Sequence, residues 1–140
     1  MKCLRSAFLG LGLLLTVSAA QAQETRVKAN IPFDFVVRNQ VLPAGEYMVV
    51  TTGSGNQAIV IRSDDGKQAI LSLTQACSSS EPSDKTKLVF HSLAGRYFLS
   101  QIWMEGYSSG RQLPKSSTEV HLAKNNNPAE EFILAAVITR

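Results

Sequence analysis

A strict alternation of apolar and polar positions begins near residue 27. Apolar side chains stand at every second position from Val27 to Val37, and most of the positions between them are polar or charged. A period of two is typical of a strand with one buried and one solvated face. Because Pro32 has no N–H to donate, we expect this strand to lie at a sheet edge or to carry a bulge there.

Six further segments have strand character and are separated by turn signals. The Pro-Ala-Gly of 42–45 and the Asp-Gly of 64–67 are typical of tight turns between strands. Both faces of 96–104 are largely apolar, which predicts a central strand. The six predicted strands are 47–52, 57–62, 68–77, 88–93, 96–104 and 132–138.

The end of the chain is the least regular part. Residues 117–124 fit one short helix, with Ser116 or Ser117 as its cap and Glu119 in its first turn. Residues 105–114 have the glycine and serine content of a loop. The apolar run 132–138 suits a buried strand, and its β-branched ending favours this over a helix.

Together these segments predict an all-β domain. About seven strands with turns at short spacing indicate an antiparallel β-sandwich or a small β-barrel, with the helix at 117–124 added to it.

The first 22 residues predict a cleavable signal peptide. Lys2 and Arg5 precede an apolar run over 7–17, and Ala20-Gln21-Ala22 provides an A-x-A cleavage site at Ala20 and Ala22. We therefore expect export to the periplasm or beyond, and one domain over 23–140. The mature chain contains no segment apolar enough to span a membrane as a helix.

Loss of the signal peptide changes both the charge and the cysteine content. The full chain carries a net charge of +3, and removal of Lys2 and Arg5 leaves about +1. No basic patch follows, so the sequence gives no support to a nucleic-acid partner. Cys77 is then the only cysteine, and as a small apolar side chain at a strand end we expect it to be buried.

The opening of the mature chain resembles a family of small exported bacterial β proteins. The similarity lies in Val27–Phe35 (VKANIPFDF) and in Leu42–Tyr47 (LPAGEY), and it continues in Lys87–His91, Arg96–Leu99 and Gln112–Ser116. It covers most of the mature chain. The family is uncharacterised, so the resemblance implies export and a β fold and assigns no catalytic or binding residue.

One short motif matches a catalytic pattern. Residues 106–110 read G-x-S-x-G, which in α/β-hydrolases places a nucleophilic serine on a strand-to-helix turn. Ser108 would be that nucleophile, with Glu119 and His121 as partners. Pro114 stops any helix after Ser108 and the chain lacks alternating strands and helices, so a flexible loop is the better interpretation.

The sequence predicts neither a metal site nor a cofactor. His91, His121 and Cys77 are widely spaced, and no pair of them has the spacing of metal ligands. We therefore expect no metal, no cofactor and no catalytic residue.

Four aromatic residues are the candidates for ligand contact: Tyr47, Tyr97, Trp103 and Tyr107. Aromatic rings with a polar tip stack on sugars or line small pockets. We expect a non-enzymatic binding module for an unknown ligand or exported protein. One alternative is an envelope assembly protein that pairs through an edge strand, above all the N-terminal one; a small serine hydrolase is the other.

Overall fold

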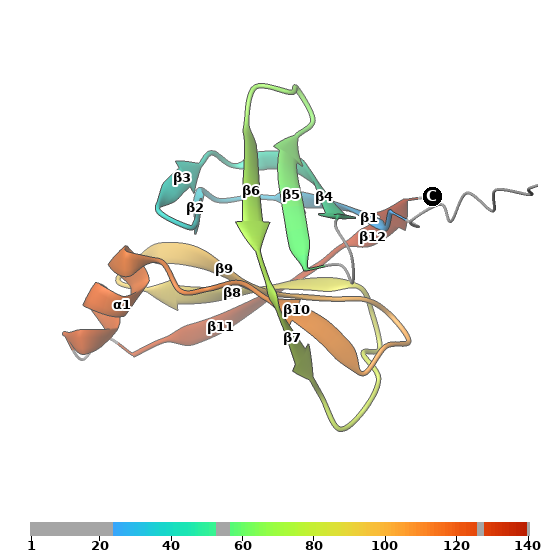
Figure 1. The fold of residues 1–140 in the computed structure, drawn as a ribbon. Coiled ribbons are helices and arrows are strands. Elements are labelled where there is room, and N and C mark those ends of the chain that lie inside the picture. The colour runs from blue at the N-terminus through green and yellow to red at the C-terminus, as the bar shows by residue number, and fades with distance from the viewer. Residues whose placement is uncertain (1–23, 53–56, 126–127, 140) are drawn as a thin grey trace, which may run out of the picture.

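The computed structural model describes residues 24–52, 57–125 and 128–139. The expected signal peptide (1–22) and the expected loop 53–56 lie outside this range. Within it, twelve strands form two sheets and one helix lies at the side (Figure 1). The strands are β1 (Arg26–Ile31), β2 (Phe35–Val37), β3 (Gln40–Leu42), β4 (Gly45–Thr52), β5 (Ala58–Ser63), β6 (Ala69–Leu73), β7 (Gln75–Ser78), β8 (Lys87–Leu93), β9 (Arg96–Trp103), β10 (Ser109–Gln112), β11 (Glu130–Ala135) and β12 (Val137–Thr139).

The two sheets, called A and B here, are built almost wholly from antiparallel pairs. Sheet A has the order β12-β1-β4-β5-β6. Sheet B has the order β11-β8-β9-β10-β7, and β2 joins it by a parallel pairing with β9 and carries β3 on its other side. The predicted all-β sandwich is confirmed. The alternative of a small barrel is wrong, because the sheets of the described residues do not close on each other.

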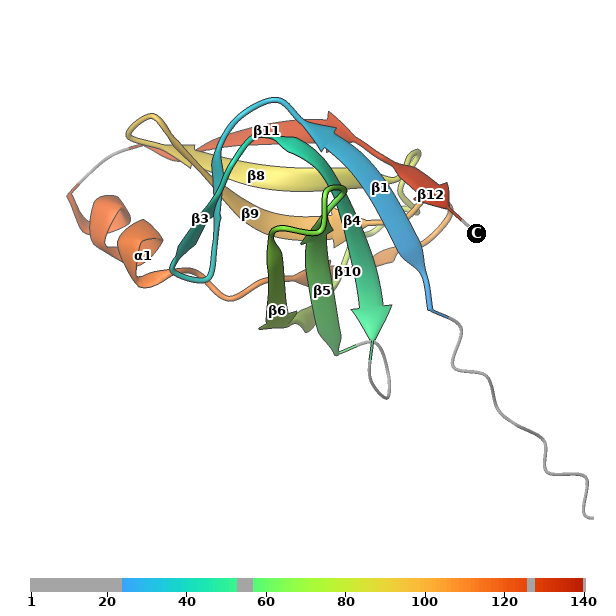
Figure 2. The same ribbon diagram turned by 90° about the horizontal axis from the view of Figure 1, so that it is seen from above.

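Three segments predicted as single strands pass from one sheet into the other. The chain leaves sheet A after β1 and enters sheet B at β2, and the same kind of switch joins β6 to β7 and β11 to β12. Figure 1 shows the last two as nearly continuous ribbons that bend between the layers, and Figure 2 shows the passage from β11 to β12 from above. Strands that switch sheets form the corners of such packings, and these switches divide three of the predicted strands in two.

The expectation that the N-terminal strand is a sheet edge is wrong. β1 pairs with β4 on one side and with β12 on the other, so it lies inside sheet A. Pro32 instead marks the point where the chain leaves this sheet, since the strand ends at Ile31. A residue without an N–H is well suited to a corner, where the ladder stops.

The expected loop over 105–114 is also partly wrong. Ser109–Gln112 forms β10, which fills the place between β9 and β7. The prediction rested on the glycine and serine content of the segment, and it missed a strand whose partners hold it in place. The strand β3 was missed for a different reason, because three residues are too few to show a periodic pattern.

Several local predictions are confirmed. Residues 132–138 form strands β11 and β12, with Ala136 between them, but the expected burial is wrong. Phe132, Ile133, Val137 and Ile138 are exposed, because β11 and β12 are edge strands of their sheets. β9 is central, with β8 on one side and with β2 and β10 sharing the other. The helix α1 (Ser117–Lys124) has the predicted bounds, and Oγ of Ser116 accepts a hydrogen bond from the backbone N–H of Glu119 at 3.1 Å.

The core fills the space between the two sheets. Inward side chains of both sheets meet in one cluster, in which Phe35, Phe90 and Leu42 are fully buried. The rings of Phe35 and Tyr47 meet edge to face with centroids 5.0 Å apart, and Phe35 meets Phe90 in the same way at 5.8 Å. Phe35 thus links the inner faces of sheets A and B.

Truncation of Phe35 is expected to destabilise the whole domain. Phe35→Ala removes a fully buried ring and leaves a cavity, so the free energy of unfolding should fall by about 3–5 kcal/mol. Denaturant unfolding measures this loss. Val41→Ala, at an exposed position on the neighbouring strand β3, is the control and should change the free energy by less than about 0.5 kcal/mol.

Candidate functional site

A cleft of about 430 Å³ lies on the outer face of sheet B, the face turned away from sheet A. Its floor is made by side chains that alternate with core residues along β8, β9 and β11. Its wall is the segment 79–84 that follows β7. The residues lining this surface, called the Trp103 cleft here, are Ser79, Glu81, Pro82, Ser83, Asp84, Lys87, Val89, Gln101, Trp103, Glu131 and Ile133.

The wall of the cleft is held by backbone hydrogen bonds to the turn after β9. The N–H of Ser79 donates to the carbonyl of Ser108 at 2.7 Å, and the N–H of Ser83 donates to that of Tyr107 at 2.9 Å. In return, the N–H of Gly106 donates to the carbonyl of Ser83 at 2.9 Å. Because both segments are fixed to each other, the cleft is formed without a ligand.

The indole ring of Trp103 packs directly against the backbone of Gly110. Gly110 lies opposite Trp103 in the β9–β10 pairing, and a Cβ at this glycine would lie 2.8 Å from Cδ2 of the indole. The indole Nε1 donates to the side-chain oxygen of Gln101 at 2.9 Å. Trp103 is only 8% exposed, so it offers a narrow strip of ring to the cleft.

The charge of the cleft is negative. Three carboxylates line it, from Glu81, Asp84 and Glu131, against the single ammonium of Lys87. The bond from Trp103 occupies the side-chain oxygen of Gln101, and its amide NH2 group provides donors. The lining thus combines several acceptors, a few donors and an apolar floor.

The helix α1 covers the other half of the same face. Val36, Leu93 and Phe98 form a second apolar cluster there, with Leu122 of α1 packed against it. The buried carboxylate of Glu119 accepts a hydrogen bond from Nδ1 of His91 at 2.9 Å, which ties α1 to β8. The cleft is the part of this face that α1 leaves open.

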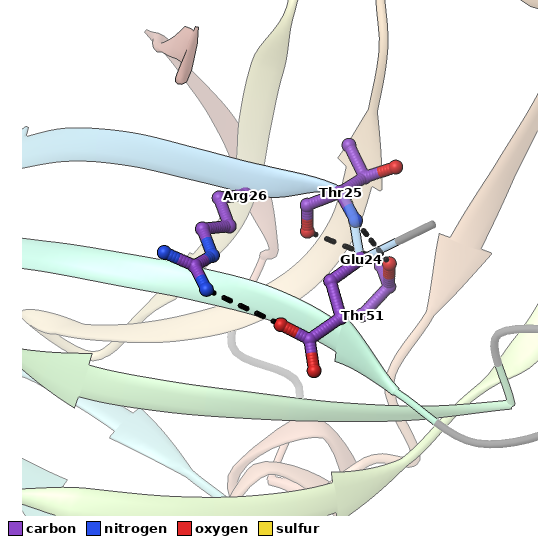
Figure 3. A network of polar contacts seen from close by, with 4 residues as sticks. All are labelled: Glu24, Thr25, Arg26 and Thr51. Atoms are coloured by element: carbon purple, nitrogen blue, oxygen red, sulfur yellow. Dashed lines mark hydrogen bonds and ion pairs between the residues drawn. The ribbon is translucent and has the colours of Figure 1, made fainter. Parts of the chain in front are cut away.

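Tyr107 lies at a different hollow, of about 600 Å³, at one end of the sandwich. Its ring is 58% exposed. The opposite wall is the start of β1, where the N–H of Thr25 donates to Oγ1 of Thr51 at 3.4 Å and the Arg26 guanidinium lies 3.4 Å from the Glu24 carboxylate (Figure 3). Trp103 and Tyr107 therefore do not form one aromatic surface.

Tyr47 and Tyr97 belong to the packing of the domain. Tyr47 is buried, and its hydroxyl donates to the carbonyl of Pro43 at 2.6 Å. Tyr97 is half-buried and stacks on Phe33 with ring centroids 3.9 Å apart. Of the four predicted aromatic candidates, only Trp103 lines the cleft.

The hydrolase constellation is not assembled. Ser108 lies in the turn after the Trp103 end of β9, whereas Glu119 and His121 lie on α1, which packs near Phe98 at the other end of that strand (Figure 1). The carboxylate of Glu119 is bound to His91 and not to His121. The two partners proposed for Ser108 are therefore not brought to it.

Cys77 has the character of a structural thiol. It is partly buried on β7, opposite Gly110, and it is a free cysteine. Burial raises the pKa of its thiol, and the nearby Gly110 N–H and Arg111 charge offset this only in part. Such a thiol is protonated at neutral pH and is a weak nucleophile.

The described residues show neither a metal-binding group nor a membrane-spanning helix. They contain no group of three or more His, Cys, Asp or Glu side chains arranged to hold a metal ion. Their single helix is too short to cross a membrane.

The sequence pointed to Trp103 but missed the rest of the cleft. Gln101 and Trp103 share one face of a predicted strand, so their proximity was readable from the period of two. The carboxylates come from the segment 79–84 and from β11, which the sequence gives no reason to place together. The His91–Glu119 contact joins residues 28 positions apart and had no local signal.

A methyl group at Gly110 is expected to displace Trp103. In Gly110→Ala, the new Cβ would stand 2.8 Å from both the Ile102 carbonyl oxygen and the indole, so strand and ring must shift. We expect a loss of about 1–3 kcal/mol in stability. Trp103 is the only tryptophan, so a red shift of its emission reports the displacement directly. Ser109→Ala on the same strand is the control; unchanged emission and stability in Gly110→Ala would contradict the close approach.

Tyr47 is expected to make the domain sensitive to alkaline pH. Burial raises the pKa of its phenol, and the carboxylates of Asp65 and Asp34 add to this. Because the unfolded phenol ionises near pH ~10, its contribution is full below that pH and is lost as the pH rises through the raised pKa. Tyr47→Phe should cost about 1 kcal/mol at neutral pH. Its stability should then fall less steeply than that of wild type above about pH 10, measured by denaturant unfolding, while the exposed variant Tyr107→Phe should follow wild type.

Comparisons of this chain with protein-family models, with curated proteins and with solved structures give no match. The resemblance carried by the VKANIPFDF and LPAGEY segments stays a prediction from the sequence.

Proposed function

We propose that this chain is an exported, non-enzymatic binding protein and that a glycan is the ligand of the Trp103 cleft. The observation that supports this most is the composition of the cleft, in which a tryptophan edge, an amide and three carboxylates line one preformed surface. Export rests on the signal-peptide pattern of residues 1–22.

The chemistry of sugars matches this lining. Sugar hydroxyls donate hydrogen bonds to carboxylates, such as those of Glu131 and Asp84, and accept them from amides such as that of Gln101. The apolar faces of a sugar ring pack on aromatic and aliphatic side chains, here Trp103 and Ile133. An open cleft also lets a chain of sugars pass through it, which an enclosed cavity does not.

The cleft fits the other ligand classes less well. A small apolar molecule favours a concave pocket with few polar groups. In this cleft charged side chains stand on both sides of the floor, with Glu131 on β11 and Asp84 on the wall. Displacing water from these carboxylates without replacing their hydrogen bonds would cost binding energy.

Loss of a carboxylate is expected to weaken glycan binding. The probe is a set of soluble oligosaccharides that includes lysozyme-released cell-wall fragments, titrated into labelled protein and followed by NMR. We expect shifts confined to the cleft, with the side-chain N–H of Trp103 among the affected signals. Glu131→Gln and Asp84→Asn should each weaken binding by about tenfold, because a charged acceptor is lost.

The control is Glu46→Gln, the same change of charge on an exposed residue of sheet A. It should bind as wild type does, and all three variants should unfold at the wild-type denaturant concentration. Absence of cleft shifts with every oligosaccharide at millimolar concentration would reject a glycan ligand. Equal weakening by Glu46→Gln would reject the cleft as the site.

A further inference from the structure

The strand β6 ends sheet A and has an open side. Among the described strands only β5 pairs with it, and both ribbon views show β6 as the last strand of its sheet (Figures 1 and 2). Its sequence over Ala69–Leu73 contains no charged residue and no proline. Leu71 and Leu73 are 53% and 71% exposed. Natural sheet edges usually carry charges, prolines or covers that prevent pairing. β6 carries no charge and no proline, and the side chain that approaches its open side is Arg38 of the β2–β3 turn.

The direction of its backbone groups follows from the ladder. In an antiparallel pair, residues that exchange hydrogen bonds alternate with residues whose N–H and C=O point outward. The bonds that bracket β6 run from the N–H of Ser63 to Gln68 and from the N–H of Thr74 to Gln57. Hydrogen-bonded positions recur at every second residue between Gln68 and Thr74, so the backbone groups of Ile70 and Ser72 point toward β5. Ala69, Leu71 and Leu73 therefore present their backbone groups to the open side.

Arg38 occupies one of these outward groups. Its guanidinium donates to the carbonyl of Leu71 at 3.2 Å across a hollow of about 460 Å³ between β6 and the β2–β3 turn. Arg38 has a φ of 52°, which long side chains rarely adopt. The carbonyl of Leu73 accepts from Oγ of Ser72. No described residue accepts from the outward N–H groups of Ala69, Leu71 and Leu73.

We propose that β6 is a docking surface for a second copy of this chain, which pairs with it antiparallel about a two-fold axis at Leu71. In this register Leu71 lies opposite its own copy, and Ala69 lies opposite Leu73. All three residues turn their backbone groups to the open side, so each of these pairs can exchange two hydrogen bonds. The Leu71 carbonyl then exchanges the Arg38 guanidinium for a backbone N–H of the copy.

A second copy fits this edge because β6 is complementary to itself. Because β6 is uncharged, pairing it with its copy places no like charges opposite each other within the ladder. In a charged edge strand, repulsion between such charges would disfavour self-association. Leu71 lies beside half-buried Val60, and Val60 beside Val50, on the outer face of sheet A. The two-fold operation joins this apolar strip to its copy, and it gives the closed, self-complementary interface of most homodimers.

The surface does not depend on what the Trp103 cleft binds, because the two lie on different sheets. Each proposal is therefore tested without the other.

The test is the oligomeric state as a function of concentration, by sedimentation equilibrium of the purified protein. We expect a monomer–dimer equilibrium that Leu71→Lys shifts toward monomer by about tenfold or more, since lysine blocks an edge. Val137→Lys is the matched control, because Val137 is 65% exposed on β12 at the opposite edge of the same sheet. Arg38→Gly frees the Leu71 carbonyl at a φ that suits glycine, and it should tighten the dimer several-fold.

Amide hydrogen exchange reports the pairing residue by residue. The N–H groups of Ala69, Leu71 and Leu73 should become protected as concentration rises, whereas those of Ile70 and Ser72 should be protected throughout. Wild type and Arg38→Gly that both stay monomeric to about 1 mM would overturn the proposal. Equal disruption by Val137→Lys, or a different protein recovered on β6 in place of a second copy, would overturn it as well.

Discussion

The passage of strands from one sheet to the other is the constraint on which this structure depends. At each corner the regular ladder stops, so the backbone groups there need other partners. The corner between β6 and β7 is held by Arg111, whose Nε donates to Oγ1 of Thr74 at 2.8 Å and whose Nη2 donates to the Thr74 carbonyl at 3.0 Å. At the corner between β11 and β12, the N–H of Ala136 donates to the carbonyl of Thr86 at 2.9 Å.

The corner between β1 and β2 brings together the segments Val27–Phe35 and Leu42–Tyr47. Oδ1 of Asp34 accepts from the N–H of Ala44 at 2.9 Å, which joins the VKANIPFDF segment to the LPAGEY segment. The rings of Phe35 and Tyr47 meet edge to face in the same region. The Tyr47 hydroxyl donates a hydrogen bond to the carbonyl of Pro43, which adds a second tie to the LPAGEY segment. These residues support the fold, and none of them lines the Trp103 cleft.

The outer faces of the two sheets differ in what covers them. On sheet B, α1 and the segment 79–84 leave the cleft between them. On sheet A no described helix lies over the outer face, and half-buried aliphatic side chains continue to the exposed leucines of β6. A sheet solvated on one face needs polar side chains or a partner there. The open cleft of sheet B and the unpaired β6 edge of sheet A both reflect this difference in cover.

The fold class, the bounds of α1 and most of the strands could be predicted from the sequence. These features depend on local pattern: a period of two, the Asp-Gly and Ala-Gly turns, and the serine that caps the helix. Gly95 and Ala94 both adopt positive φ at their turn, as a two-residue hairpin requires. Trp103, which lines the cleft, was a candidate from the sequence as well, since an aromatic residue on one face of a strand is visible there.

Long-range pairing, in contrast, determines which strands are interior, where the chain passes between the sheets and which side chains share a surface. β1 became an interior strand because β12, more than a hundred residues later, pairs with it. β10 is a strand because β7 and β9 lie on both sides of a segment with the composition of a loop. The cleft joins residues of β8, β9, β11 and the segment 79–84, and the open edge of β6 exists because no other described strand reaches it. Such contacts depend on pairing across long stretches of chain, which no local pattern encodes.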